Sequence, residues 1–544
     1  MSKIKIFSLG GQNENGKNMY VVEVEQDIFV FDAGLKIADD RMLGIDYILP
    51  DYSYIKENIK RVKGIFITHG HDEHMGAVTD LVEDIPEVKI YATEFTADII
   101  KNDLDEFNIK YDNLIVIKPH QKIDFGENSI FPISLTHSVP DAVGYVLTTK
   151  GGAIFYTGNY VFDSTMSGPY KTDIGKIAYI GKKGILCLMS ECLYAEKSGW
   201  TAPHHRLSKT IATTLNKTNK RIIYNVFQAD LYRIQELFDE VVATDRNIVI
   251  SGRNLELIIK QAIEKKYISF DKKRIKEIKD ANEENIVLLI SDDKEKPFSN
   301  ISRIVRGFDK FVKMRETDTV LFATPIYEGF EKSASKIFDE IARVGADLVI
   351  ASDCREHNAS SEDLMLMLNL TSPKYFMPVI GEFREMVTAK EVAKKVGLTE
   401  DRVIIKLNGQ VAEFVDGNLV ASDEKIKIDD ILIDGKKTGD IGEIVIKDRE
   451  FLGENGTVIV TFTVDKSSKA IIVEPKITSK GFVFEKDEYI KEAEAIAKKA
   501  VDEIRKPFFL DFNKVKTEIR LKLAKYLFKI TDSKPMILVI IQEI

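Results

Sequence analysis

The chain has 544 residues, of which 44% are hydrophobic and 30% are charged. This composition excludes a disordered protein, and the length exceeds a single hydrophobic core, so we expect about two to four domains. The formal net charge of −9 argues against capture of nucleic acid by the whole surface, but it leaves room for a local basic groove. Because the sequence has no run of about 18 apolar residues and no signal-peptide core, we expect a cytoplasmic protein without a membrane segment.

Short strands separated by turns are predicted through the first third of the chain, as in a layered α/β protein. They are KIKIFSLGG, MYVVEVE, IFVFDAG, GIFITHG, KIYATE, LIVIKP and AIFYTGN. From about residue 200 helices and strands alternate, which predicts an inserted α/β domain. The earlier pattern resumes after about residue 360. From about residue 450, strand signals, two helices and the strand MILVIIQEI predict a compact α+β domain.

A cluster of histidines and carboxylates follows the predicted strand GIFIT, at positions His69, His71, Asp72, Glu73 and His74. Gly70 lets the turn bring both flanking imidazoles to one point at the end of the strand, where they can face a common ion. Glu73 and His74 would face a second position beside it, which suits two metals that share a hydroxide. The alternative is a polar turn without metal, but three of the eight histidines of the chain fall within these six positions.

This stretch resembles the HxHxDH motif of the metallo-β-lactamase superfamily. Asp32 in IFVFDAG matches an aspartate of the first motif that orients a ligand histidine, and His137 in LTHSVPDAVG matches the histidine of the third motif. The phrases SLGGQNENGKNMYVVE, SPKYFMPVIGEFRE and GDIGEIVIKDREFL extend the resemblance nearly from end to end. They resemble the ribonuclease J family of the β-CASP group, which implies a role in bacterial RNA maturation and decay.

The resemblance also implies an architecture and a set of partners. We expect a metallo-β-lactamase αββα sandwich interrupted by an inserted β-CASP α/β domain and followed by a small α+β domain. The expected boundaries are residues 1–200 and 359–440 for the sandwich, 201–358 for the insertion, 441–455 for a linker and 456–544 for a C-terminal association domain. The implied partners are RNA and either a second copy of the chain or an active ribonuclease J paralogue.

Several metal-ligand positions depart from the family pattern. Glu73 stands where the family has the aspartate of the histidine motif. Asn159 in TGN stands in place of the bridging aspartate, and Ile380 in PVIGE stands in place of the last histidine. An amide oxygen brings no negative charge to a bridge between two cations, and isoleucine cannot bind a metal. We therefore expect at most one weakly bound Zn²⁺, or none. The first site keeps the ligands His69, His71 and His137, and the second keeps only Glu73, His74 and the weakened bridge Asn159.

The β-CASP motifs depart as well. Glu191 in SECLYAE replaces an aspartate, Tyr232 in QADLYRIQ replaces a histidine, and residues 291–297 replace a glycine-rich loop. The H-x-S-G-H segment becomes Cys354-Arg355-Glu356-His357-Asn358, and Glu356 would repel the phosphate that a serine would bind. The candidate catalytic residues are then Glu73 and His357, and the candidate RNA-facing residues are Glu191, Tyr232 and Asn358.

Three further aromatic residues lie near the expected domain junction. His204 and His205 in TAPHHRLS are expected in a solvated segment. Trp200 in KSGWTAP has two alternatives, because an isolated tryptophan can stack on a base or pack at a domain interface.

Three hypotheses follow for function. The chain could be a fully active metal-dependent 5′-to-3′ exo- and endoribonuclease, but this requires a two-metal centre that the sequence does not support. It could be a degenerate second paralogue in the ribonuclease J family, with weak or no nuclease activity of its own, that works with an active paralogue. It could also be a small-molecule metallo-hydrolase, although such an enzyme would need neither the β-CASP insertion nor the C-terminal domain. We favour the second hypothesis.

Overall fold

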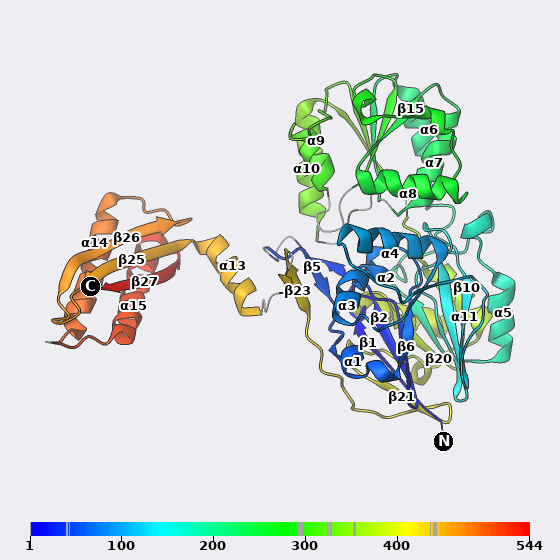
Figure 1. Cartoon of the computed structure of the whole chain (residues 1–544), viewed down its shortest axis with the longest axis horizontal. Coiled ribbons are helices and arrows are strands. Elements are labelled where there is room, and N and C mark those ends of the chain that lie inside the picture. Colours follow the sequence, from blue (N-terminus) through cyan, green and yellow to red (C-terminus); the bar gives the residue numbers. More distant parts are fainter. Residues whose placement is uncertain are drawn as a thin grey trace. The chain divides into compact units, whose positions relative to one another are not determined.

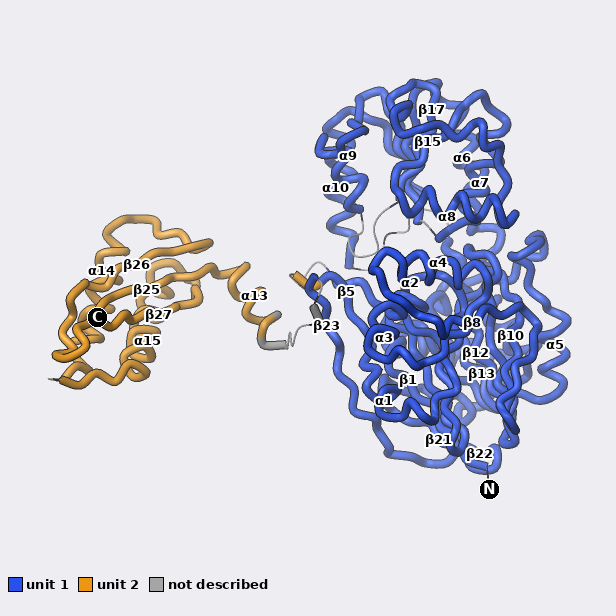
Figure 2. The backbone as a smooth tube through the Cα atoms, in the orientation of Figure 1, with its two compact units in different colours: residues 1–39, 46–438 blue, residues 40–45, 439–544 orange. Residues whose placement is uncertain are grey.

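The structure is a computed structural model that describes residues 2–39, 42, 44–227, 229–291, 298–323, 326, 329–351, 355–435, 437, 438, 443–506 and 508–544. These residues form two compact units (Figure 2). The larger unit spans residues 1–39 and 46–438, and the smaller unit spans residues 40–45 and 439–544.

Two β-sheets packed face to face form the centre of the larger unit (Figure 1). The first sheet, in the order β22-β21-β1-β2-β3-β6-β7-β8, contains β1 Lys3–Gly10, β2 Met19–Val24, β3 Asp27–Phe31, β6 Val62–Phe66, β7 Ile90–Thr93, β8 Leu114–Ile117, β21 Ala412–Val415 and β22 Asn418–Val420. The second sheet, in the order β20-β13-β12-β11-β10-β9, contains β9 Ile123–Phe125, β10 Asn128–Ser134, β11 Val143–Thr149, β12 Gly152–Tyr156, β13 Ile185–Glu191 and β20 Tyr375–Val379. A small sheet contains β4 Lys36–Ile37, β5 Tyr47–Leu49, β23 Ile431–Asp434 and β24 Lys437–Thr438.

Both faces of these sheets are apolar because helices cover their outer sides. In β2, Met19 and Val21 pack toward the helices, whereas Tyr20 and Val22 pack toward the second sheet, as the period of two along a strand requires. The helices over the first sheet are α1 Ser53–Glu57, α2 Asp72–Met75, α3 Val78–Asp84 and α4 Glu94–Glu106. Those over the second are α5 Ile174–Lys183, α11 Ser361–Thr371 and α12 Phe383–Lys395. This layering confirms the predicted αββα sandwich.

An inserted domain leaves the sandwich after β13, and the chain returns to the sandwich with α11 and β20. Its six-stranded parallel sheet, in the order β16-β15-β17-β14-β18-β19, contains β14 Ile222–Asn225, β15 Asn247–Ser251, β16 Ile275–Lys276, β17 Ile286–Ile290, β18 Thr319–Phe322 and β19 Asp347–Ile350. Helices α6 Ser208–Lys217, α7 Leu231–Val242 and α8 Arg253–Glu264 pack on one face, and α9 Ser299–Val305 and α10 Glu331–Val344 pack on the other (Figure 1). All five residues of β17 are buried, as expected for a strand covered on both faces.

Short 3₁₀ helices complete the larger unit: η1 Ile59–Arg61, η2 Gly168–Tyr170, η3 Lys272–Arg274, η4 Ile278–Asp280 and η5 Glu400–Arg402. In the part of the chain that the structure describes, no helix is long and apolar enough to cross a bilayer.

The smaller unit has its own core. Its sheet, in the order β26-β25-β27, contains β25 Thr457–Val464, β26 Ile471–Lys480 and β27 Met536–Glu543, with β25 antiparallel to β26 and parallel to β27. Helices α14 Asp487–Ile504 and α15 Phe512–Thr531 pack against this sheet. Helix α13 Glu443–Asn455 lies within the segment predicted as a linker.

Helix α14 uses apolar side chains inside this unit. Ala493, Ala497 and Ala500 are fully buried against β25 and α15, because alanines let the helix approach its neighbours closely. The exposed apolar side chains of this unit include Leu538 and Ile540 of β27. They alternate with Ile537 and Val539 of the core, so they lie on the sheet face opposite the helices.

A buried ion pair joins two strand beginnings in the inserted domain. The Arg221 guanidinium, 1% exposed, donates to both carboxylate oxygens of Asp318, at 3.0 Å through Nε and 2.6 Å through Nη2. We expect Asp318→Ala to lower the free energy of unfolding by about 3–5 kcal/mol, because it leaves a buried guanidinium without its carboxylate. Urea unfolding of the full chain measures this. The control is Asp347→Ala, which breaks the exposed pair with Lys217 and should change stability by less than about 1 kcal/mol. Equal effects of both substitutions would contradict the prediction.

Candidate metal centre

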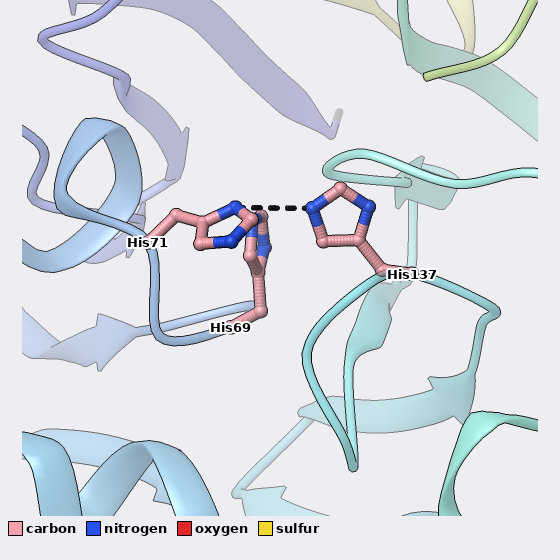
Figure 3. Close-up of side chains that lie close together, drawn as sticks. All are labelled: His69, His71 and His137. Carbon is pink, nitrogen blue, oxygen red and sulfur yellow. Dashed lines mark hydrogen bonds between the residues drawn. The ribbon is translucent and has the colours of Figure 1, made fainter. Parts of the chain in front are cut away.

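Three histidines from two separate segments meet at one point beside the ends of the sheets (Figure 3). His69 follows β6, His71 immediately precedes α2, and His137 follows β10. One ligand nitrogen from each of the three side chains lies within 4.8 Å of the others. A Cβ at Gly70, between the first two, would lie 2.6 Å from Cδ1 of Ile99, so the side chain of Ile99 would have to shift.

Hydrogen bonds orient two of these imidazoles so that Nε2 faces the centre. The hydroxyl of Thr68 donates to Asp32, so it accepts from Nδ1–H of His69 at 3.0 Å. The Nε2 atom of His69 is buried without a hydrogen-bond partner. Nδ1–H of His137 donates to the carbonyl of His357 at 2.8 Å, and its Nε2 lies 3.1 Å from Nδ1 of His71. The centre therefore presents imidazole lone pairs to a common point.

Burial keeps these imidazoles neutral. It lowers the pKa of His69 and His71 well below the usual value, with a further contribution from the neighbouring histidines, and it lowers the pKa of His137 to about 3. Metal ligation requires neutral imidazole. Three neutral imidazoles with one unpartnered buried Nε2 thus fit a tetrahedral metal that keeps one open position, which is the geometry of catalytic zinc sites.

Asp32 accepts hydrogen bonds from several residues next to the metal centre. It is fully buried and accepts from Nδ1–H of His74 at 2.7 Å, from the backbone N–H of Thr68 at 2.7 Å and from the hydroxyl of Tyr156 at 2.6 Å. The sequence predicts that this aspartate orients a ligand histidine. The structure places it in direct contact with His74 and, through Thr68, in contact with His69.

For Glu73, His74 and Asn159, the residues predicted for a second metal, this role stays a prediction. Among the described residues, the group of three or more histidine, cysteine, aspartate or glutamate side chains that could hold a metal is the triad, which includes neither Glu73 nor His74. His74 is held between Asp32 and Asn18, whose Nδ2 lies 3.4 Å from its Nε2. The backbone carbonyl of Glu73 accepts from both the N–H and the amide of Asn18.

Asn159 belongs to a buried hydrogen-bond network. Its amide nitrogen donates to Glu191 and to the side-chain oxygen of Asn358, both at 2.8 Å. The other carboxylate oxygen of Glu191 accepts from the N–H groups of Tyr160 at 2.6 Å and Ala359 at 3.0 Å. Burial raises the pKa of Glu191 to about 8 in spite of these donors. A carboxylate at position 159 would face two acceptors here, whereas the amide satisfies both without a cation.

Two of the predicted RNA-facing residues, Glu191 and Asn358, are buried in this network, with exposures of 0% and 5%. Their hydrogen bonds hold this part of the site in place, and their contact with RNA stays a prediction.

Ile380 has an unfavourable backbone conformation. Its φ is +53°, and the side chain is 1% exposed. A β-branched residue is an outlier in this left-handed region, which histidine and asparagine adopt more readily. The conformation is held by hydrogen bonds from its N–H to the carbonyl of Gly11 and the hydroxyl of Tyr20. The backbone conformation at position 380 therefore suits histidine or asparagine better than isoleucine.

A second aromatic cluster adjoins the triad. His357 is 3% exposed, its Nε2 has no hydrogen-bond partner, and its ring centroid lies 6.1 Å from that of His137. The ring of half-buried Tyr232 lies 5.0 Å from that of His357. The expectation that His205 is solvated is wrong. His205 is fully buried, its ring is 4.7 Å from that of His357, and its Nε2 is 3.3 Å from the carboxylate of Asp163.

Thr68, Asp163 and His205 are site residues that sequence reasoning missed. Thr68 had a signal, since it is the polar end of an apolar strand directly before His69. The contact between Asp163 and His205 had none. Residues 292–297 and Cys354, for which the sequence predicts altered RNA contacts, lie outside the described residues.

This fold and site define a metallo-β-lactamase protein of the β-CASP type. Family models match three parts of the chain: the metallo-β-lactamase superfamily at residues 13–176, the ribonuclease J β-CASP domain at 219–341 and the ribonuclease J C-terminal domain at 444–544. Ribonuclease J2 of Bacillus subtilis (strain 168) is 35% identical, covering 99% of both chains. Ribonuclease J 2 of Staphylococcus aureus (strain NCTC 8325 / PS 47) is 32% identical, covering 99% of this chain and 98% of the relative. The chain belongs to the ribonuclease J family.

Two conclusions follow from membership of this family. The superfamily implies a bound metal, and the family implies RNA binding. A crystal structure of a protein of unknown function from Enterococcus faecalis V583 aligns with a TM-score of 0.53 at 15% identity, covering 76% of this chain and 100% of that one. That likeness concerns the fold alone.

Thr68→Val tests the orientation of His69. The valine keeps the shape of threonine but removes the acceptor for Nδ1–H of His69 and the donor to Asp32. We expect zinc affinity to fall about 10- to 100-fold, as for other outer hydrogen bonds of metal ligands. Competition with a chromophoric chelator measures this. The control is Thr79→Val on α3, outside the site, which should bind zinc like the unmodified chain. Unchanged affinity of Thr68→Val would show that this hydroxyl does not set the imidazole.

Proposed function

We propose that this chain is a ribonuclease J-type subunit of bacterial RNA maturation and mRNA decay that has a degraded metal site and weak or no nuclease activity of its own. It works with an active ribonuclease J paralogue. The observation that carries the proposal is the Asn159 network, in which the neutral amide nitrogen at the bridging position donates hydrogen bonds to Glu191 and Asn358.

Two-metal hydrolysis of a phosphodiester needs ligands that this chain lacks. Two cations about 4 Å apart stabilise the attacking and the leaving oxygen together, and an anionic bridge offsets their repulsion. Asn159 points its N–H₂ group at Glu191 and so offers no anion. Ile380 is buried in the apolar core and supplies no ligand. The proposal is therefore that at most one Zn²⁺ is held, by His69, His71 and His137.

A single metal at the triad supports residual chemistry. Zinc held by the triad would lower the pKa of a water molecule. Around it, His357 would present its unpartnered Nε2 to a phosphate or leaving oxygen, and Tyr232 beside it would help to position the RNA. Glu73 is the candidate base, at the start of α2. The small-molecule hydrolase is disfavoured because it would use neither of the other two domains.

Restoring the missing ligands tests the degraded-site proposal. Asn159→Asp combined with Ile380→His should raise the metal content above one ion per chain and raise cleavage of a labelled oligoribonucleotide. The left-handed backbone at position 380 accepts histidine more readily than isoleucine. Elemental analysis and a nuclease assay measure the two effects.

The matched control is Asn159→Asp with Ile380→Asn, which suits the same backbone but lacks an imidazole. It should bind less metal and cleave less RNA than the histidine variant. Two tightly held ions in the unmodified chain, or robust turnover after removal of contaminating nuclease, would sink the proposal.

We also propose that residues 456–544 connect the chain to a second copy or to the active paralogue. Support comes from the open sheet face of this unit, on which Leu538 and Ile540 are 39% and 54% exposed. Burial of such side chains stabilises an interface by about 25 cal/mol per Å² of apolar surface. The sheet face toward α14 and α15 is already covered by those helices.

Leu538→Lys with Ile540→Lys in the full chain should disrupt assembly, because the new charges would be buried in the interface. Light scattering measures the mass of the chain alone and mixed with the active paralogue, and truncation after residue 455 should have the same effect. The control is Leu521→Lys, at an apolar position on α15 that is 63% exposed. Unchanged mass in both mixtures would show that this face is not the connector.

A further inference from the structure

We propose that Trp200 is a stacking platform for a base of single-stranded RNA beside the metal centre, an inference that rests on the proposed RNA-binding function. Trp200 is the single tryptophan of the chain, and 42% of it is exposed. Tryptophan is among the side chains whose apolar surface is most costly to leave in water. This exposed part of the indole is available to a partner of the chain.

The backbone around this indole is fixed on both sides. The Arg355 guanidinium donates to the carbonyls of Trp200 at 2.9 Å and Ser198 at 3.0 Å. The hydroxyl of Ser360 donates to the carbonyl of Gly199 at 2.8 Å, and the N–H of Thr201 donates to buried Asp363 at 3.0 Å. A ring on a fixed backbone loses little conformational entropy when a base stacks on it.

The same segment ties this platform to the metal centre. The hydroxyl of Thr201, the next residue, donates to the carbonyl of Asn358 at 2.6 Å. The side chain of Asn358 binds Asn159, and the adjacent carbonyl of His357 accepts from His137. The segment that positions Trp200 therefore also positions the triad. An RNA strand bound at the metal centre would reach the loop that carries the indole.

Charged side chains of both signs adjoin the loop that carries the indole. Lys197 and Arg355 bring positive charge, and Nζ of Lys197 lies 3.1 Å from the centroid of the Tyr194 ring. Glu196 and Glu362 bring negative charge, so the choice of nucleic acid as the partner rests on the exposed ring and on the proposed function. Aromatic rings between basic side chains bind single strands without sequence preference, since every base has a π-face.

A single tryptophan makes the test direct. The full chain is titrated, with chelator to prevent cleavage, against an oligouridylate of about 12 nucleotides, and the tryptophan emission is followed. Anisotropy of a labelled oligouridylate reports binding separately. We expect emission to be quenched in step with binding. We expect Trp200→Ala to weaken binding about 5- to 150-fold and Trp200→Phe to weaken it less, because the phenyl ring still stacks.

Two controls separate stacking from charge and from general damage. Tyr179→Ala, at a 59% exposed aromatic on α5, should bind RNA like the unmodified chain. An abasic oligomer of equal length should bind the unmodified chain and Trp200→Ala equally, because it offers phosphates without bases. Circular dichroism checks that Trp200→Ala remains folded, and Trp200→Phe provides a second reading if it does not.

Binding of RNA with unmoved emission, or equal affinity of Trp200→Ala and the unmodified chain, would overturn this inference and leave the proposed function standing. Emission that shifts with protein concentration in the absence of RNA would mean that a second protein surface covers the ring, and would also overturn it. No anisotropy change with the unmodified chain would remove the proposed RNA binding and this inference together.

Discussion

The parallel pairing of three neighbouring strands is the constraint on which the rest of the site depends. β13 lies between β12 and β20, and β20 returns from beyond the whole inserted domain to pair in register with β13. Parallel strands present their carboxyl ends at one edge of the sheet. Asn159, Glu191 and Ile380 follow or end these strands, so the three positions meet only because the insertion closes on itself and lets β20 return.

At that edge, hydrogen bonds stabilise the polar side chains that cations would stabilise in an intact two-metal centre. The Asn159 amide satisfies the carboxylate of Glu191 and the side chain of Asn358, and a fully satisfied buried network is rigid. The left-handed backbone at Ile380 is kept in shape by Tyr20 and Gly11. These hydrogen bonds therefore hold the shape of this edge, as the proposed scaffold for RNA requires.

The remaining surfaces divide between the two units. In the larger unit, the segment from Arg355 to Asp363 both supports the triad and pins the loop that carries Trp200. In the smaller unit, the alanines of α14 are used in its own core, and the open face of the β-sheet exposes Leu538 and Ile540. The proposed surface toward RNA and the proposed surface toward another chain thus belong to different units of the protein.

Local patterns in the sequence determined much of this protein. Strand periodicity, together with family motifs at His69–His74, Asp32 and His137, predicted the layered fold and the residues of the triad. The tertiary structure alone decided the burial of His205, the role of Thr68, the partners of Asn159 and the use of the α14 alanines. These depend on contacts between distant segments, such as the bond between Asn159 and Asn358 across 199 positions. No local periodicity encodes such a contact, because it arises only when separate elements pack together.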